Sequence, residues 1–177
     1  MQYRRTFVPG GTYFFTVVTA ARRKLFYDEG TVQLVRQAFS HVNTRRPFTV
    51  NAMVVLPDHL HCIWTLPTDD DDYPTRWRLI KTWVTKHYLP CLHHDSRGLG
   101  RREPTVWQAR YWEHLIRDEE DYRQHVEYIH YNPVKHGQIP RPRDWPHSSF
   151  RQYVQERLYP REWGDTAPLL DEKVGHE

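Results

Sequence analysis

Apolar and polar residues alternate in several short stretches of the chain, a pattern typical of β-strands with one buried face. These stretches are rich in β-branched and aromatic residues, and they predict strands over residues 12–19, 47–56, 59–66 and 111–116. Pro57 and Asp58 form a turn signal between the second and third strands. Residues 47–66 are therefore expected to form an antiparallel hairpin.

Other stretches repeat apolar residues at spacings of three and four, which is the periodicity of a helix with one buried side. They predict helices over residues 28–44, about 75–88 and about 119–132. Asp28 and Asp118 are suitable N-terminal caps, and Pro133 and Gly137 are expected to close the last helix.

The resulting order, β-α-β-β-α-β-α, predicts an α+β sandwich in which a central antiparallel sheet carries its helices mainly on one face. The 177 residues suit one domain, assigned to residues 1–164. Residues 90–104 lack periodicity and are expected to form a flexible loop. The proline- and aromatic-rich part after residue 138 is expected to wrap the surface, and the polar residues 165–177 to form a flexible tail.

The composition narrows the class of protein. Only 38% of the residues are hydrophobic, but aromatic residues make up 14% and can supply core area. No apolar run has membrane-spanning length, and no signal-peptide pattern follows Met1. Cys62 and Cys91 are isolated in the sequence. We therefore expect a cytoplasmic protein that does not bind membranes.

Basic residues occur in pairs, although the formal net charge is only +3. The pairs are Arg4-Arg5, Arg22-Arg23, Arg45-Arg46 and Arg101-Arg102. Acidic residues gather elsewhere, and such segregation of charge suits a polyanion such as nucleic acid. For any single pair a solvated turn is the simpler explanation; only the recurrence of pairs at element ends favours nucleic acid.

Two histidines stand out on the predicted strand 59–66. Side chains two apart share a face, so His59, His61 and Ile63 point one way and the apolar residues between them point to the core. Two neutral imidazoles on a rigid strand can converge on a divalent ion. The alternative is a pair of surface histidines on a sheet face with few helices, and a metal site also needs a third ligand.

The last predicted helix offers that ligand. Tyr122, Val126 and Ile129 form the stripe that docks on the sheet, whereas Tyr128 and Asn132 are an i, i+4 pair on a different face. A tyrosine could attack a phosphodiester that a divalent ion polarises, forming a phosphotyrosine that conserves the ester energy. Tyr131 and His130 are competing polar candidates on the same helix.

These residues lie in motifs that resemble a known family. LPDHLHCIWTLP, RWRLIK, WQARYWEHLIRDEEDY and HVEYIHYNPVKHG, in this order, are similar to the REP-associated tyrosine transposases. These are relatives of single-tyrosine insertion-sequence transposases in the HUH superfamily of single-strand nucleases. The similarity runs from about residue 3 to about 164 and implies a ferredoxin-like fold. It places the metal ligands at His59, His61 and Asn132, and the nucleophile at Tyr128.

The resemblance also implies what the protein acts on. Members use Mg²⁺ or Mn²⁺ to cleave single-stranded DNA beside repetitive extragenic palindromes (REPs), leaving a 5′-phosphotyrosine. They recognise a hairpin with a short GTAG guide and are thought to act as monomers, here in the bacterial cytoplasm on the nucleoid. The region of Arg4, Arg5, Gly10 and Gly11 is expected to meet the guide. Phosphate contacts are expected from Arg22, Arg23, Arg45 and Arg46. The insert 91–104 departs from the family pattern, which leaves details of DNA contact open.

Two other functions are considered. One is a domesticated, non-catalytic factor that only binds REP hairpins. The other is a histidine-triad nucleotide hydrolase, which needs a third alternating histidine where this chain has Ile63.

Overall fold

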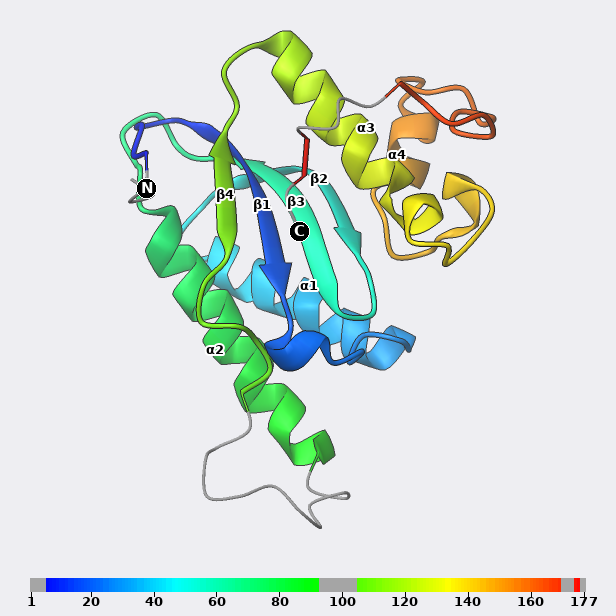
Figure 1. Cartoon of the computed structure of the whole chain (residues 1–177). Coiled ribbons are helices and arrows are strands. Elements are labelled where there is room, and N and C mark those ends of the chain that lie inside the picture. The colour runs from blue at the N-terminus through cyan, green and yellow to red at the C-terminus, as the bar shows by residue number, and fades with distance from the viewer. Residues whose placement is uncertain (1–5, 93–104, 170–173, 176–177) are drawn as a thin grey trace.

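The computed structural model describes residues 6–92, 105–169 and 174–175, and its centre is a four-stranded antiparallel sheet in the order β2-β3-β1-β4. The elements in chain order are β1 (Thr12–Val18), η1 (Ala20–Arg22), α1 (Glu29–Asn43), β2 (Thr49–Val55), β3 (His59–Thr65), α2 (Tyr73–Leu92), β4 (Trp112–Leu115), α3 (Glu119–Lys135), η3 (Pro142–Asp144) and α4 (Phe150–Gln155) (Figure 1). This strand order is that of a ferredoxin-like sheet, so the predicted α+β class is confirmed.

The predicted hairpin is formed by β2 and β3, which pair antiparallel around the turn at Pro57 and Asp58. The central strand β1 lies between β3 and β4. Because β1 and β3 run in opposite directions, Val18 pairs with His59 and Thr16 pairs with His61. The histidines therefore lie where β3 begins and β1 ends.

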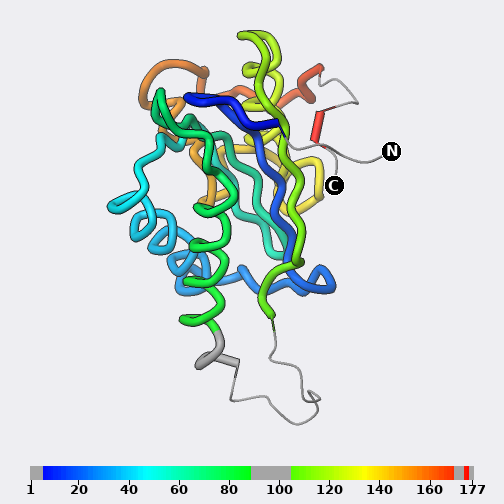
Figure 2. The backbone as a smooth tube through the Cα atoms, turned by 90° about the vertical axis from the view of Figure 1, so that its left-hand side faces the viewer, coloured from blue at the N-terminus to red at the C-terminus, as the bar shows by residue number. Residues whose placement is uncertain are grey.

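One face of the sheet is covered by α1 and α2, which lie along it in Figure 2. Leu60, Cys62 and Trp64 point from β3 into this layer, as their alternation predicts. Aromatic side chains fill much of it: Trp64 stacks on Trp77 of α2 with ring centroids 4.7 Å apart. The low hydrophobic fraction of the chain is thus offset by large rings.

The opposite face is covered by α3 and α4. Ile63 and Phe14 of the sheet pack there with Val126 and Ile129 of α3, as the predicted stripe requires. This second helical layer corrects the expectation that the histidine face carries few helices. The pattern of apolar residues in the sequence does not reveal the full buried surface of α3, because this helix also buries polar side chains, among them Asn132.

The helix α3 begins as predicted but ends later. Asp118 caps it by accepting a hydrogen bond from the Asp121 amide at 2.8 Å. Pro133 does not close it, and the helix continues to Lys135, with Gly137 at φ +64° just beyond. A proline in the last turn removes one donor, and the ladder resumes with the bond from the His136 amide to the Asn132 carbonyl. Because α3 extends to Lys135, this residue lies on the same helix as Tyr128.

The region after α3 is more than a surface wrap. Phe150 and Tyr153 of α4 are buried, and Val174 packs against the cluster beneath α3. Arg4, Arg5 and most of the insert, residues 93–104, lie outside the described residues. Among the helices that are described, none combines the length and apolar character needed to span a bilayer.

Candidate active site

His59 and His61 form the centre of the site. Their ring centroids lie 4.9 Å apart on β3, and only 1% and 0% of the two residues is exposed to solvent. They are therefore not surface histidines on an open sheet. Burial removes water that would compete for the imidazole nitrogens, so the pair is preorganised on a rigid strand.

Each histidine is oriented by a neighbouring side chain through its Nδ1 atom. Nδ1 of His59 lies 2.6 Å from a carboxylate oxygen of Asp58, and Nδ1 of His61 lies 2.9 Å from the Thr16 hydroxyl. Burial alone would raise the pKa of Asp58, but its hydrogen bond with His59 and the charge of Arg22 lower it overall. The ionised Asp58 holds the proton of His59 on Nδ1, so the lone pair is on Nε2.

The helix α3 carries Tyr128 to this pair. The rings of Tyr128 and His61 lie 5.2 Å apart in an edge-to-face arrangement, and Tyr128 is 2% exposed. Asn132, one turn later on α3, is fully buried. The pattern placed Tyr128 and Asn132 on a face away from the docking stripe. Instead the buried surface of α3 is wide enough to include both.

The Tyr128 hydroxyl has two well-defined neighbours. It donates a hydrogen bond to the carbonyl oxygen of Gly175 at 3.1 Å and accepts one from Nζ of Lys135 at 3.2 Å. The short C-terminal segment Val174–Gly175 lies beside α3 (Figure 1). The segment therefore occupies the space directly beside the Tyr128 hydroxyl on that side.

Several site residues were missed by the reasoning from sequence. They are Thr16, Asp58, Lys135 and His136, whose ring lies 5.0 Å from that of His59. Asp58 could have been identified from the sequence, because it directly precedes the histidine pair. The others come from pairing across strands or from the last turn of a helix that was expected to end at residue 132.

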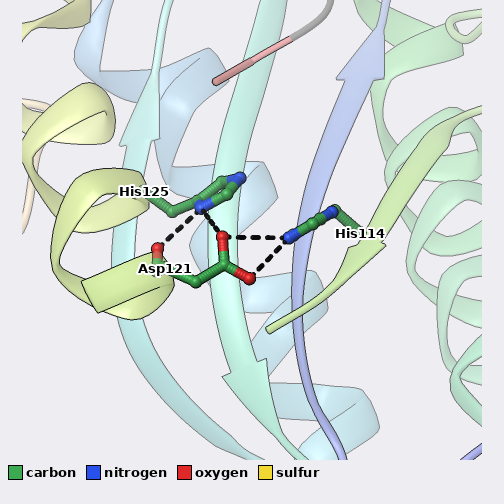
Figure 3. A group of neighbouring side chains, drawn as sticks. All are labelled: His114, Asp121 and His125. Carbon is green, nitrogen blue, oxygen red and sulfur yellow. Dashed lines mark hydrogen bonds and ion pairs between the residues drawn. The ribbon is translucent and has the colours of Figure 1, made fainter. Parts of the chain in front are cut away.

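A second cluster of metal-binding residue types lies where α3 starts against β4 (Figure 3). His114, Asp121 and His125 each offer a ligand atom within 4.8 Å of the others. Nε2 of His114 lies 2.8 Å from the Asp121 carboxylate, and Nδ1 of His125 lies 2.7 Å from the Asp121 carbonyl oxygen.

The geometry of this cluster favours a hydrogen-bonded network over a metal centre. The two imidazoles stack with planes only 15° apart, and the lone pairs of stacked rings lie in separate parallel planes. Arg117 also donates to the Asp121 carboxylate from its amide at 3.0 Å and from Nε at 3.1 Å. The network therefore fixes the start of α3 on β4, and its last member, His125, lies three residues before Tyr128.

The residues predicted to bind DNA fall at two ends of the sheet. Arg22 lies at the histidine end, 3.5 Å from the Asp58 carboxylate, and Arg23 donates to the Thr105 carbonyl. Gly10 and Gly11 precede β1 at the other end, about 20 Å away along the strand at roughly 3.3 Å per residue. A shallow groove there runs between the two glycines and the segment after β4.

A side chain would not fit at Gly11, where a Cβ atom would lie 2.6 Å from the Tyr13 ring, and Gly10 has a φ of +70°. Arg45 and Arg46 follow α1, on the face opposite the histidines. Arg45 is exposed, whereas Arg46 forms an ion pair with Asp72 at 3.1 Å. Of the predicted basic residues, those that the structure describes are thus distributed around the molecule and do not form one patch.

Comparison with known proteins gives close relatives. A REP-associated tyrosine transposase of Escherichia coli K12 is 46% identical over 162 residues, which cover 92% of this chain and 90% of that protein. A candidate member of the same family from Haemophilus influenzae is 41% identical over 169 residues, covering 94% and 95%. No protein-family model matches the chain.

Solved structures agree with these relatives. A REP-associated tyrosine transposase bound to a REP hairpin superposes with a TM-score of 0.82 at 43% identity, covering 100% of this chain and 98% of the other. A candidate transposase of Deinococcus radiodurans is 19% identical, with a TM-score of 0.50 over 73% of this chain and 95% of the other, a likeness of fold only.

Proposed function

Since this chain belongs to the REP-associated tyrosine transposases, enzymes that cleave and rejoin DNA, we propose that it is a metal-dependent endonuclease and strand transferase for single-stranded DNA at REP hairpins. The observation that carries the proposal is the meeting of Tyr128 with His61, at 5.2 Å between ring centroids, in a buried site built from β3 and α3. A nucleophile placed beside two oriented imidazoles that can hold a metal ion is an arrangement that supports attack on a phosphodiester.

The residues present fit a divalent ion. His59 and His61 are both held through Nδ1, which leaves Nε2 of each as the ligand atom, and Asn132 supplies a neutral oxygen. Three neutral ligands leave the charge of Mg²⁺ or Mn²⁺ available to polarise a phosphate oxygen. Imidazoles suit harder ions such as Mg²⁺ poorly, so we expect weak metal binding without DNA and tighter binding with it.

Tyr128 acts as the nucleophile in this proposal. Its hydroxyl oxygen attacks the phosphorus, the bond from phosphorus to the 3′ oxygen breaks, and a 5′-phosphotyrosine and a free 3′-hydroxyl result. Because the new ester stores the energy of the old one, the 3′-hydroxyl of a strand can reverse the step and rejoin DNA without ATP. The hydrogen bond to Gly175 must be released first.

Hairpin recognition follows the positions of the glycines and arginines. We expect the GTAG guide at the groove beside Gly10 and Gly11, with Arg4 and Arg5 preceding it, and the cleaved phosphate at the histidine end near Arg22 and Arg23. The solved relative bound to a REP hairpin supports this class of partner. We also expect a monomer that works in the cytoplasm, on nucleoid DNA.

A cleavage assay with labelled single-stranded REP DNA tests the function. The protein with Mg²⁺ or Mn²⁺ should cut beside the hairpin, whereas Tyr128→Phe or a chelator should abolish the cut and leave hairpin binding intact. Tyr131→Phe, the neighbouring tyrosine, is the matched control and should cut normally. Hairpin binding without any cleavage by the unaltered protein would instead identify a non-catalytic binding factor.

A further inference from the structure

The ammonium group of Lys135 meets the reacting oxygen of the proposed nucleophile. Its Nζ donates to the Tyr128 hydroxyl at 3.2 Å and lies 4.7 Å from the centroid of the Tyr128 ring. Both residues lie on α3, seven positions and hence about two turns apart. This contact exists because α3 continues through Pro133 and carries Lys135 in its final turn.

From this geometry we propose that Lys135 is a further catalytic residue, which stabilises the phenolate of Tyr128 when it attacks and again when it leaves. The inference rests on the proposed nucleophile. A hydroxyl oxygen that attacks a phosphodiester is a weak nucleophile unless a neighbouring group activates it. A cation at hydrogen-bond distance stabilises the negative charge that develops on such an oxygen in the transition state. The phosphate and its metal act on the other reactant, so the nucleophile needs a partner of its own.

The charge of Lys135 serves both directions of the reaction. In cleavage the Tyr128 proton passes through water to the departing 3′ oxygen, while the Oη–P bond forms and the P–O3′ bond breaks. In rejoining a 3′-hydroxyl attacks the phosphorus and Tyr128 leaves as a phenolate. The ammonium group of Lys135 contributes a positive charge at the oxygen on which negative charge develops.

The position of Lys135 limits the size of the effect. Lys135 is exposed, whereas Tyr128 is only 2% exposed. Water therefore screens the charge of the ammonium group and weakens its effect on the buried Tyr128 oxygen. We therefore expect a contribution of about tenfold to the cleavage rate, below the roughly 10²- to 10³-fold that one buried donor contributes at a developing oxyanion.

Single-turnover cleavage of REP DNA at saturating protein and metal tests the inference. Lys135→Gln should lose about tenfold in rate, because the positive charge beside the Tyr128 oxygen is removed. Lys135→Arg should restore most of the rate. Lys86→Gln removes one exposed charge from α2, on the opposite face of the sheet, and should leave the rate unchanged.

A second measurement separates stabilisation of the phenolate from a merely structural role. Incorporation of 3-fluorotyrosine at position 128 makes the phenol more acidic, and it should rescue Lys135→Gln near pH 7 more than it accelerates the unaltered protein. A Lys135→Gln rate equal to that of the unaltered protein would overturn the inference. So would a loss of rate that 3-fluorotyrosine does not rescue. If Tyr128→Phe still cleaves, the proposed nucleophile itself fails, which is a distinct outcome.

Discussion

The carbonyl oxygen of Gly175 lies 3.1 Å from the hydroxyl oxygen of Tyr128, so the C-terminal segment holds the nucleophile of the proposed reaction. The approach is close enough that a Cβ atom on Gly175 would lie 2.0 Å from Cζ of the Tyr128 ring. Only glycine permits this contact, and Gly175 also has a φ of +73°.

Gly175→Ala should displace the segment and accelerate REP cleavage by about fivefold, the factor equivalent to releasing one hydrogen bond of about 1 kcal/mol. Gly137→Ala is the matched control, because Gly137 also has a positive φ but open space around it. Equal rates for the unaltered protein and Gly175→Ala would show that the segment does not restrict Tyr128.

Asp58→Asn should weaken metal binding. The carboxylate that fixes the Nδ1 proton of His59 is lost, and such outer partners typically contribute about 10- to 100-fold to affinity. Titration of Mn²⁺ into the complex with a REP oligonucleotide, followed by electron paramagnetic resonance, measures the change. Asp69→Asn, an exposed acid in the loop after β3, should bind Mn²⁺ as the unaltered protein does.

The Asp121 network should stabilise the fold in a pH-dependent way. Burial acts to raise the pKa of Asp121, but hydrogen bonds from His114 and Arg117 lower it to about 2. A carboxyl whose folded pKa is lowered stabilises the fold fully above its unfolded pKa of about 4, and the effect disappears as the pH falls through about 2.

In urea unfolding, Asp121→Asn should therefore lower the free energy of unfolding by about 2 kcal/mol at pH 7, with the difference shrinking toward pH 2. Glu119→Gln, an exposed acid in the same helical turn, should change the stability little. A pH-independent difference for Asp121→Asn would assign its effect to packing.

Arg45 tests the predicted phosphate contacts at the end of α1, on the face of the sheet opposite the histidines. Arg45→Gln should weaken REP hairpin binding and reduce the slope of log affinity against log salt by about 0.7 to 0.9, as expected for one lost phosphate contact. Arg36→Gln, whose arginine pairs with Glu29 at 2.6 Å, is the control. An unchanged slope would remove Arg45 from the DNA interface.

Most of the fold was predictable, because the strands and helices carry strong periodic patterns. The helical spacing of Val32, Val35 and Phe39 predicted α1. The alternation around His59 and His61 correctly predicted which side chains of β3 point into the core under α1 and α2. The extension of α3 past Pro133 was not predictable from proline alone, since one missing donor in a last turn is tolerated.

The candidate site was only partly predictable. The family motifs and the strand alternation identified His59, His61, Tyr128 and Asn132, which the structure gathers around β3 and α3. Thr16 reaches His61 only through the register of β1 on β3. Such contacts depend on tertiary pairing, which no local pattern in the chain contains.

The covalent intermediate is the most direct test of the central claim. The protein should be incubated with single-stranded REP DNA and Mn²⁺, denatured and digested, and the peptide that contains Tyr128 analysed by mass spectrometry. The account predicts that this peptide gains a 5′-phosphorylated DNA fragment on Tyr128, and that the gain is absent in Tyr128→Phe. Cleaved DNA with no adduct on Tyr128, or an adduct on another residue, would contradict it.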